Sequence, residues 1–349
     1  MNGNYIFSLI TVVVLGLLAF FGTTVFGLQY LFGVIVPYAC VIWFVFGILK
    51  RMLGWANSPV PFRITTTCGQ QKSLPWIKQN RIDNPSTGIE TIIRMILEIV
   101  LFRSLFRNTK SDITASGKVT YIWEKWLWVG ALAFHYSFLV VIVRHMRFFT
   151  DPVPYLISML EYFDSLFKIE FVGEVVGTSL QIGLPGFFIS GLVLLAAILF
   201  LFSRRVLISQ VRYISLPADF FPLFLLMGIA GTGIFMRYFS KVDIISIKEL
   251  TMGLATFCIP DGAVLAGLSS VFYIHLFLVC ILLAYFPFSK LMHMGGVFLS
   301  PTRNLPNNSR ARRHINPWNY PVKVHTYDEY EDEFREKMIE AGLPVEKES

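Results

Sequence analysis

Six long apolar runs, each free of Asp, Glu, Lys and Arg, constrain what this chain folds into more than any other feature. A helix needs about 20 apolar residues to cross a bilayer, and it satisfies its own backbone hydrogen bonds there. Charged residues make up 15% of the chain, whereas a soluble domain has about 25%. We therefore predict an all-α membrane protein with a six-helix transmembrane bundle. Its spans are expected at about residues 5–21, 31–49, 126–143, 183–202, 220–235 and 263–288.

The distribution of Lys and Arg predicts how these spans are oriented. Both residues are concentrated at 50–125, at 204–212 and in the tail after Lys290, whereas the segment 151–174 is acidic. Basic connections remain on the cytoplasmic side. We expect a multi-pass protein of the cytoplasmic (inner) membrane with both termini in the cytoplasm. The formal net charge of +7 then reflects topology, and membrane lipid rather than nucleic acid is the expected environment.

A membrane-surface helix is predicted in the loop that precedes the third span. Thr87 and Glu90 have the spacing of a capping box, and isoleucines follow at helical intervals. Glu90, Arg94 and Glu98 are expected on the opposite face. Such an amphipathic helix lies in the interface between lipid and water. Docking of a partner protein and simple interfacial anchoring are both compatible with it.

Histidines carry the chemistry of this sequence. Of six, His135 and His145 lie in or just after the third run, and His275 and His293 lie in or just after the sixth. A polar ring inside a bilayer is costly and suggests a function. A hydrogen-bonded core histidine and the proton relay of a transporter are the alternatives for one isolated residue. Two pairs on two helices favour a cofactor.

Helical spacing indicates how these histidines pair. His135 and His145 are about 15 Å apart along a helix, and His275 and His293 are about 27 Å apart, on one face of a continuous helix. The third and sixth spans run in opposite directions. This places His145 opposite His275 on the outer side and His135 opposite His293 on the cytoplasmic side. A neutral imidazole on each side of the iron is one way to hold haem b, so we expect two haems b with these four ligands.

Other metal chemistry is not expected. Zinc needs a tight cluster of ligands, and none surrounds these histidines. The cysteines form no C-x-x-C pair, so neither an iron–sulfur cluster nor a covalently attached haem is predicted. They are Cys40, Cys68, Cys258 and Cys280. Pairing of Cys258 with Cys280 remains open, and no role is assigned to Cys68, His314 or His325.

Cations near the span ends are candidate partners for haem propionates. These are Arg144, Arg147, Arg237 and Lys290. Charge-assisted hydrogen bonds to carboxylates are strong. Ordinary anchoring at the lipid headgroups is the alternative for each of them. With these assignments, we expect two transmembrane helices in residues 1–50, a cytoplasmic loop in 51–124, a four-helix di-haem cytochrome b core in 125–295 and a cytoplasmic tail in 296–349.

The histidine spacings, ten on one helix and eighteen on a later one, resemble the gamma subunit of respiratory nitrate reductase over residues 30–295. In that family the first histidine of the early helix pairs with the last of the late helix. The resemblance implies the same two pairs as the spacing, and it implies quinol oxidation beside the outer haem. Arg144 stands where that family has glycine, so details of its quinol site do not transfer.

Three further segments resemble the DsrM family, the membrane cytochrome subunit of the Dsr complex of sulfate and sulfite metabolism, which in archaea is called the Hdr-like menaquinol-oxidizing enzyme. They are Cys68–Trp76, then Arg94 and Met95 with Phe102–Asn108, and Arg313–Tyr327. The resemblance implies menaquinone or menaquinol as substrate, sulfate respiration as the setting and the other Dsr subunits as partners. It also implies a cytoplasmic iron–sulfur subunit like the catalytic subunit of heterodisulfide reductase.

The expected function is therefore a membrane cytochrome b subunit that oxidises menaquinol and passes electrons to that iron–sulfur subunit. It would be the quinol-oxidising part of an oxidoreductase and would not act alone on sulfur compounds. One alternative is an electron carrier that works in the opposite direction or serves a periplasmic cytochrome c. The other is a transporter with buried histidine relays.

Overall fold

The structure is a computed structural model that describes residues 3–58, 76, 78–166, 169–175, 178–184, 187–308 and 325–346. Within these residues, six helices are long and apolar enough to cross a membrane, which confirms the predicted all-α membrane fold. They are α1 (Gly3–Thr24), the π-helical turn η1 (Leu31–Ile35) with α2 (Val36–Ala56), α5 (Lys125–His145), α7 (Ile189–Leu207), α9 (Pro217–Phe235) and α12 (Ser270–Tyr285).

Shorter elements connect these six helices. The helices among them are α3 (Gly88–Leu101), α4 (Arg103–Phe106), α6 (Tyr155–Asp164), α8 (Ser209–Ile214), α10 (Ile244–Thr256), α11 (Gly262–Gly267), α13 (His293–Leu299), α14 (Pro301–Asn304) and α15 (Tyr327–Glu340). The single-turn helices are η2 (Met146–Phe148), η3 (Met236–Ser240), η4 (Phe286–Phe288) and η5 (Lys290–Met292). Three antiparallel strand pairs are β1 (Thr109–Ile113) with β2 (Val119–Trp123), β3 (Ser165–Leu166) with β6 (Phe187–Phe188), and β4 (Ile169–Val175) with β5 (Thr178–Leu184).

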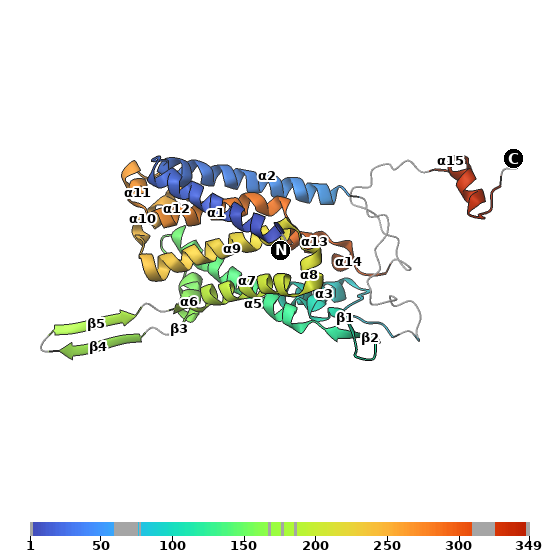
Figure 1. The fold of residues 1–349 in the computed structure, drawn as a ribbon, viewed down its shortest axis with the longest axis horizontal. Coiled ribbons are helices and arrows are strands. Elements are labelled where there is room, and N and C mark those ends of the chain that lie inside the picture. The colour runs from blue at the N-terminus through green and yellow to red at the C-terminus, as the bar shows by residue number, and fades with distance from the viewer. Residues whose placement is uncertain are drawn as a thin grey trace.

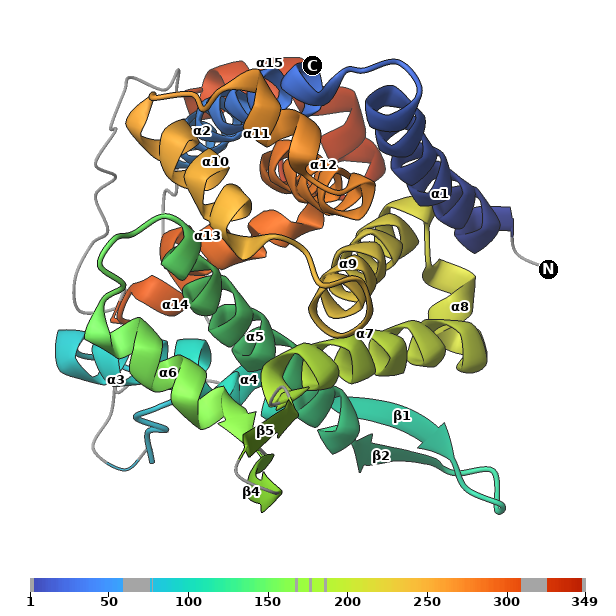
Figure 2. The same ribbon diagram turned by 90° about the vertical axis from the view of Figure 1, so that its left-hand side faces the viewer.

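The spanning helices form two layers that α9 joins (Figures 1 and 2). In one layer α5 packs on α7, and in the other α12 packs on α1 and α2. Helix α9 packs on α7 as well as on α1 and α12, and its buried Leu225 contacts Val12 of α1 and Leu278 of α12. By contrast, α5 and α12 are not among the closely packed helix pairs. The layer of α5 and α7 therefore faces the layer of α1, α2 and α12, with α5 opposite α12.

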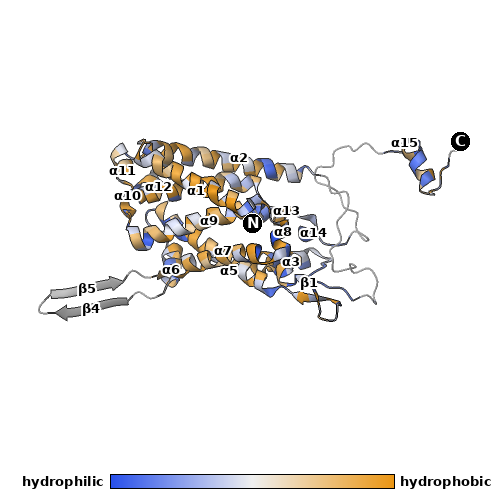
Figure 3. Cartoon of the chain, viewed as in Figure 1, coloured by the Kyte–Doolittle hydropathy of each residue, from blue (hydrophilic) through white to orange (hydrophobic). Residues whose placement is uncertain are grey.

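The outer surface of the bundle is apolar, as a lipid-facing surface must be. Many large hydrophobic side chains on the spanning helices are exposed, for example Ile42 at 70% and Phe7 at 65%. Figure 3 shows these residues along the helices, with hydrophilic residues gathered toward the end that carries α3, α13 and α14. In lipid such exposure carries no cost, whereas in water it would drive association. The exposed surface supports the membrane assignment.

Helix α3 has its polar face buried and its apolar face exposed. The capping box predicted for Thr87 and Glu90 is present with both of its hydrogen bonds. Arg94 and Glu98 are buried, at 7% and 8% exposure, whereas Ile92 is exposed at 61%. A helix of this kind is stable where lipid covers the apolar side. It lies beside one end of α5, and α6 lies beside the other end (Figures 1 and 2).

Candidate functional site

The structure brings the four histidines together in the two pairs that the sequence predicts. The ring centroids of His135 and His293 are 5.9 Å apart, with an angle of 86° between the ring planes. The centroids of His145 and His275 are 6.4 Å apart, and their planes differ by 16°. Both pairs join α5 to the facing layer. Each pair therefore bridges two helices that do not pack closely on each other.

The helix that carries the second histidine of each pair is broken. We expected His275 and His293 to share one face of a continuous helix, and this expectation was wrong. Helix α12 ends at Tyr285, followed by the turn with Pro287 and by an extended Ser289 with ψ of 179°. Proline lacks the amide hydrogen that continues a helix. His293 is the first residue of the separate short helix α13.

A second correction concerns the start of this span. The sixth apolar run was predicted from residue 263, but α11 ends at Gly267 and α12 begins at Ser270. The hydroxyl of Ser269 accepts a hydrogen bond from the amide of Phe272 and caps the new helix. Serine favours such N-cap positions because its side chain satisfies an otherwise unpaired amide. The break confines the transmembrane part of this run to α12 and η4, Ser270–Phe288.

The Nδ1 atom of every one of these four histidines has a hydrogen-bond acceptor. His135 donates to the carbonyl of Ala131 at 2.7 Å and His145 to that of Val141 at 2.6 Å, each four residues earlier on α5. His293 donates to the carbonyl of Lys290 at 2.9 Å. The Nδ1 atom of His275 lies 2.9 Å from the hydroxyl of Thr232.

A carbonyl can only accept, so the proton lies on Nδ1 and Nε2 is left as a free lone pair. For His275 the acceptor is a hydroxyl; two carbonyls, those of Gly228 at 2.7 Å and Ile229 at 3.1 Å, can take the hydroxyl hydrogen of Thr232, which leaves its oxygen to accept from Nδ1. Metal-binding histidines nearly always donate their second ring nitrogen in this way, which fixes the tautomer and the ring orientation. The four rings thus have the tautomer of metal ligands.

The distance between the rings fits an iron atom between each pair. With metal–nitrogen bonds of about 2.0–2.1 Å and about 1.1 Å from nitrogen to ring centroid, two imidazoles on opposite sides of one metal have centroids about 6.3 Å apart. The measured 5.9 Å and 6.4 Å lie close to this value. Phe102 and Phe134 lie edge-on to His135 at 4.9 Å and 5.0 Å, so the surroundings are apolar. The donors and the spacing fit a haem in each position.

The described residues contain no further cluster of metal ligands, and their cysteines form no disulfide. No group of three His, Cys, Asp or Glu side chains there has the arrangement of a metal site. Cys258 and Cys280, whose pairing was left open, are both free. His325 precedes α15 and lies near Glu333, at 3.9 Å. Cys68 and His314 lie outside the described residues.

Three of the four cations predicted near propionates are engaged by carboxylates. Arg144 pairs with Asp164 at 2.5 Å, Arg147 with Glu161, and Lys290 with Asp219 at 2.7 Å. The ion pairs of Arg144 and Arg147 connect α6 to the end of α5 at which His145 lies. Both Arg144 and Arg237 stack over the ring of Phe188, at 3.4 Å and 4.6 Å. In the described chain no carboxylate is paired with Arg237, which makes it the most available cation of the four.

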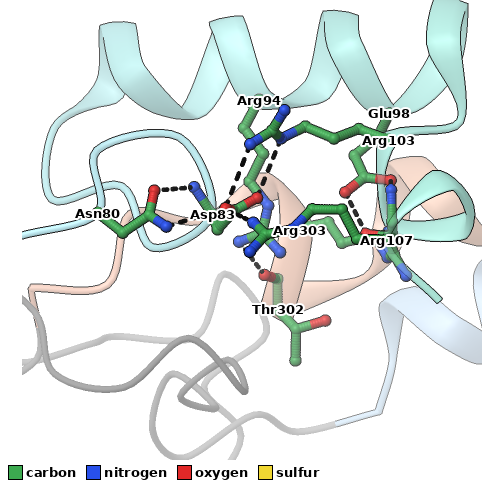
Figure 4. A network of polar contacts seen from close by, with 9 residues as sticks. Asn80, Asp83, Arg94, Glu98, Arg103, Arg107, Thr302 and Arg303 are labelled. Carbon is green, nitrogen blue, oxygen red and sulfur yellow. Dashed lines mark hydrogen bonds and ion pairs between the residues drawn. The ribbon is translucent and has the colours of Figure 1, made fainter. Parts of the chain in front are cut away.

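A polar network ties the His293 segment to α3 (Figure 4). Glu98 pairs with Arg303 at 2.9 Å and also accepts a hydrogen bond from the amide of Ser104. Arg94 donates to the carbonyl of Thr302 at 3.0 Å. The same region includes Asp83, which pairs with Arg103 at 3.0 Å and with Arg107. Because α13 and α14 contain few buried apolar residues, these contacts hold His293 in place.

Besides Phe148, whose ring centroid lies 5.9 Å from that of His145, sequence reasoning missed two residues that contact the histidines. One is Phe102, whose φ of 48° lies in the left-handed region and turns the chain from α3 to α4. Such a conformation costs a bulky residue about 1–3 kcal/mol and often marks a functional position. The other is Thr232 on α9. No local signal identifies either, since both contacts depend on how distant segments pack.

Comparison with known proteins shows what this chain is similar to. The family described as "Nitrate reductase gamma subunit" matches residues 94–308. A protein named "Hdr-like menaquinol oxidoreductase cytochrome b-like subunit" from Archaeoglobus fulgidus is 48% identical over 292 residues, which cover 82% of this chain and 83% of that protein. A protein of the same name from Archaeoglobus profundus is 41% identical over 285 residues, with 81% of each chain covered.

Proposed function

Because the chain belongs to the nitrate reductase gamma subunit family, we propose that it is the di-haem cytochrome b subunit of a menaquinol-oxidising, Hdr-like complex. The observation that carries the proposal is the two facing histidine pairs, each with Nδ1 hydrogen-bonded and Nε2 free. His135 with His293 would bind one haem iron, and His145 with His275 the other. When bound, the two haems supply one-electron centres stacked across the membrane.

The resemblance to the nitrate reductase gamma subunit supports quinol oxidation beside the outer pair of histidines. The basic residues at the ends of α2 and α7 support an orientation in which the end with α3 and α13 faces the cytoplasm. The pair His145 and His275 is then on the outer side, next to α6. Menaquinol would bind there, where Arg144, Arg147, Asp164 and Glu161 supply polar groups between lipid and the histidines. Oxidation of one quinol releases two electrons and two protons.

Charge separation follows if the protons leave on the outer side and the electrons leave on the cytoplasmic side. Moving one elementary charge across the membrane is worth about 2.3 kcal/mol per 100 mV. The network of Figure 4 connects α3 with α14, which follows the short helix of His293, and gives a folded surface to which a partner can bind. That partner is proposed to be an iron–sulfur subunit resembling the heterodisulfide reductase catalytic subunit, within a Dsr-type complex of sulfate respiration.

The four cations contribute differently to this proposal. Arg237 would pair with a propionate of the outer haem, since no described carboxylate is paired with it. Arg144, Arg147 and Lys290 already have carboxylate partners and would act chiefly by holding α6 and the Lys290 turn in place. A guanidinium gives a carboxylate two parallel hydrogen bonds, which suits a propionate.

The purified chain tests the proposal directly. It should contain two haems b that are extractable by acid acetone and that a menaquinol analogue reduces. His145→Ala should abolish this reduction while the inner haem remains bound. Reduction of the inner haem at the wild-type rate in this variant would move the quinol site to the cytoplasmic side. A chain without a Soret band would instead favour a transporter, and haems that quinol does not reduce would favour a carrier serving a periplasmic cytochrome c.

A further inference from the structure

The imidazole of His275 is oriented by a different helix from its own. His135, His145 and His293 each donate to a carbonyl three or four residues earlier in their own segment. His275 on α12 donates to the hydroxyl of Thr232 on α9. We propose that Thr232 is the positioning residue of His275 and that it sets the reduction potential of the outer haem. This inference rests on the proposed function.

The local geometry of α9 makes this contact possible. The Thr232 hydroxyl can donate its hydrogen to the carbonyls of Gly228 and Ile229 on its own helix, so its oxygen can accept from the imidazole. Gly233 follows, and a Cβ added there would lie 3.3 Å from Cε1 of His275. The absence of a side chain at this position lets α9 approach the ring. A π-helical turn, η3, begins three residues later, and such turns are frequent at functional sites.

The hydrogen bond has an electronic consequence for a bound iron. When Nδ1–H donates to an acceptor, electron density at Nε2 rises and the ligand becomes more basic. A more basic ligand stabilises the oxidised iron more than the reduced iron, which lowers the reduction potential. Outer-shell hydrogen bonds are among the means by which a protein adjusts a haem potential. Loss of the acceptor should therefore make the potential more positive.

Thr232 supplies the one side-chain acceptor among the four histidines, and a substitution can remove it; the backbone carbonyl of Ile229, also on α9, lies near the same imidazole and stays in place. The acceptors of the other three histidines are backbone carbonyls, which every residue carries. The contact joins α9 to α12 at the end of the bundle where quinol is proposed to bind. At the other end of α9, Asp219 pairs with Lys290, whose carbonyl is the acceptor of His293. One helix thus supports both histidines of the facing layer.

The test compares Thr232→Val, which keeps the shape and removes the hydroxyl, with Thr232→Ser, which keeps the hydroxyl. Thr23→Val is the matched control, because Thr23 makes the same back-bonds to its own helix, to Ala19 at 2.8 Å and Phe20 at 3.3 Å, and contacts no histidine. Optical redox titration of the purified full chain gives the midpoint potential of each haem. A His293→Ala background leaves the outer haem alone for the assignment.

Thr232→Val should shift the outer midpoint potential to a more positive value, or lose the outer haem, while Thr232→Ser and Thr23→Val keep both haems and both potentials. Two haems with unchanged potentials in Thr232→Val would overturn the inference and leave the proposed function intact. An equal shift in Thr23→Val would also overturn it, because the effect would then be general. A wild-type chain that binds no haem would overturn the proposed function itself.

Discussion

The imidazole planes of His145 and His275 are nearly parallel, 16° apart, with centroids separated by 6.4 Å. The planes of His135 and His293 are nearly perpendicular, at 86°. Each orientation is held by an Nδ1 hydrogen bond, and rings fixed in this way keep their orientation when a metal binds. The two proposed haem sites therefore differ in symmetry although their ligands are chemically identical.

This difference predicts two distinct low-spin signals in the oxidised protein. Near-parallel imidazoles split the iron d orbitals and give a rhombic electron paramagnetic resonance spectrum. Near-perpendicular imidazoles leave two orbitals almost degenerate and give a strongly anisotropic signal dominated by one g value. We expect one signal of each type in continuous-wave spectra. His145→Ala should remove the rhombic signal and His135→Ala the anisotropic one; two signals of the same type would contradict the ring geometry.

Each single histidine substitution should remove one of the two proposed haems and leave the other bound. His135→Ala or His293→Ala should remove one haem, and His145→Ala or His275→Ala the other, since each iron would lose one of its two axial ligands. Pyridine haemochrome assay of the purified variants measures this. His325→Ala is the control and should retain both haems. If His325→Ala loses a haem, the assignment of ligands is wrong.

Gly47 on α2 provides a test of the break between α12 and α13. A Cβ added there would lie 2.7 Å from Cβ of Pro287 and 2.9 Å from the Phe288 ring. Overpacking of this kind costs about 1–3 kcal/mol. Gly47→Ala should therefore lower the melting temperature and weaken binding of the inner haem by displacing His293. Gly54→Ala, on the same helix with nothing within 4 Å, should do neither.

The contact between Glu98 and Arg303 should stabilise the segment that carries His293. Arg303→Met leaves the carboxylate of Glu98, which is 6% exposed, without its cation. Since Arg303 is itself 34% exposed, we expect a loss of about 1–3 kcal/mol in the free energy of unfolding. Thermal unfolding followed by the Soret absorbance checks this.

Arg81→Met is the matched control for that substitution. The side chain of Arg81 is 78% exposed and lies 3.9 Å from Glu90, so its removal should cost about 0–1 kcal/mol. Equal destabilisation by the two variants would mean that burial of the Glu98 pair contributes nothing to stability.

Reporter fusions test the proposed orientation. Fusions after Lys118 and after Arg313 should report the cytoplasm, because basic connections remain on that side. A fusion near Glu161 should report the outside. A cytoplasmic signal near Glu161 would invert the topology and exchange the sides of the two histidine pairs.

Much of the fold was predictable because the bilayer imposes a simple requirement on the sequence. The third span was expected at residues 126–143 and is found at Lys125–Phe148. The capping box at Thr87 and Glu90 was recognised because both partners lie within one turn. The histidine pairs followed from antiparallel helices and the spacing of the residues. The break at Leu268 was missed because hydropathy continues through it, and the break at Ser289 was missed because the helix was extended to His293 beyond the predicted end of the span at 288.

Sequence alone determined where the chain crosses the membrane and which histidines can face each other, since both depend on local composition and on spacing along a helix. Tertiary structure alone decided the acceptor of His275, the ring of Phe102 beside His135, and the carboxylate partner of Arg144. These contacts join residues far apart in the chain. They depend on the rotation of each helix about its axis, and that rotation is set by packing against neighbouring helices, which no local pattern encodes.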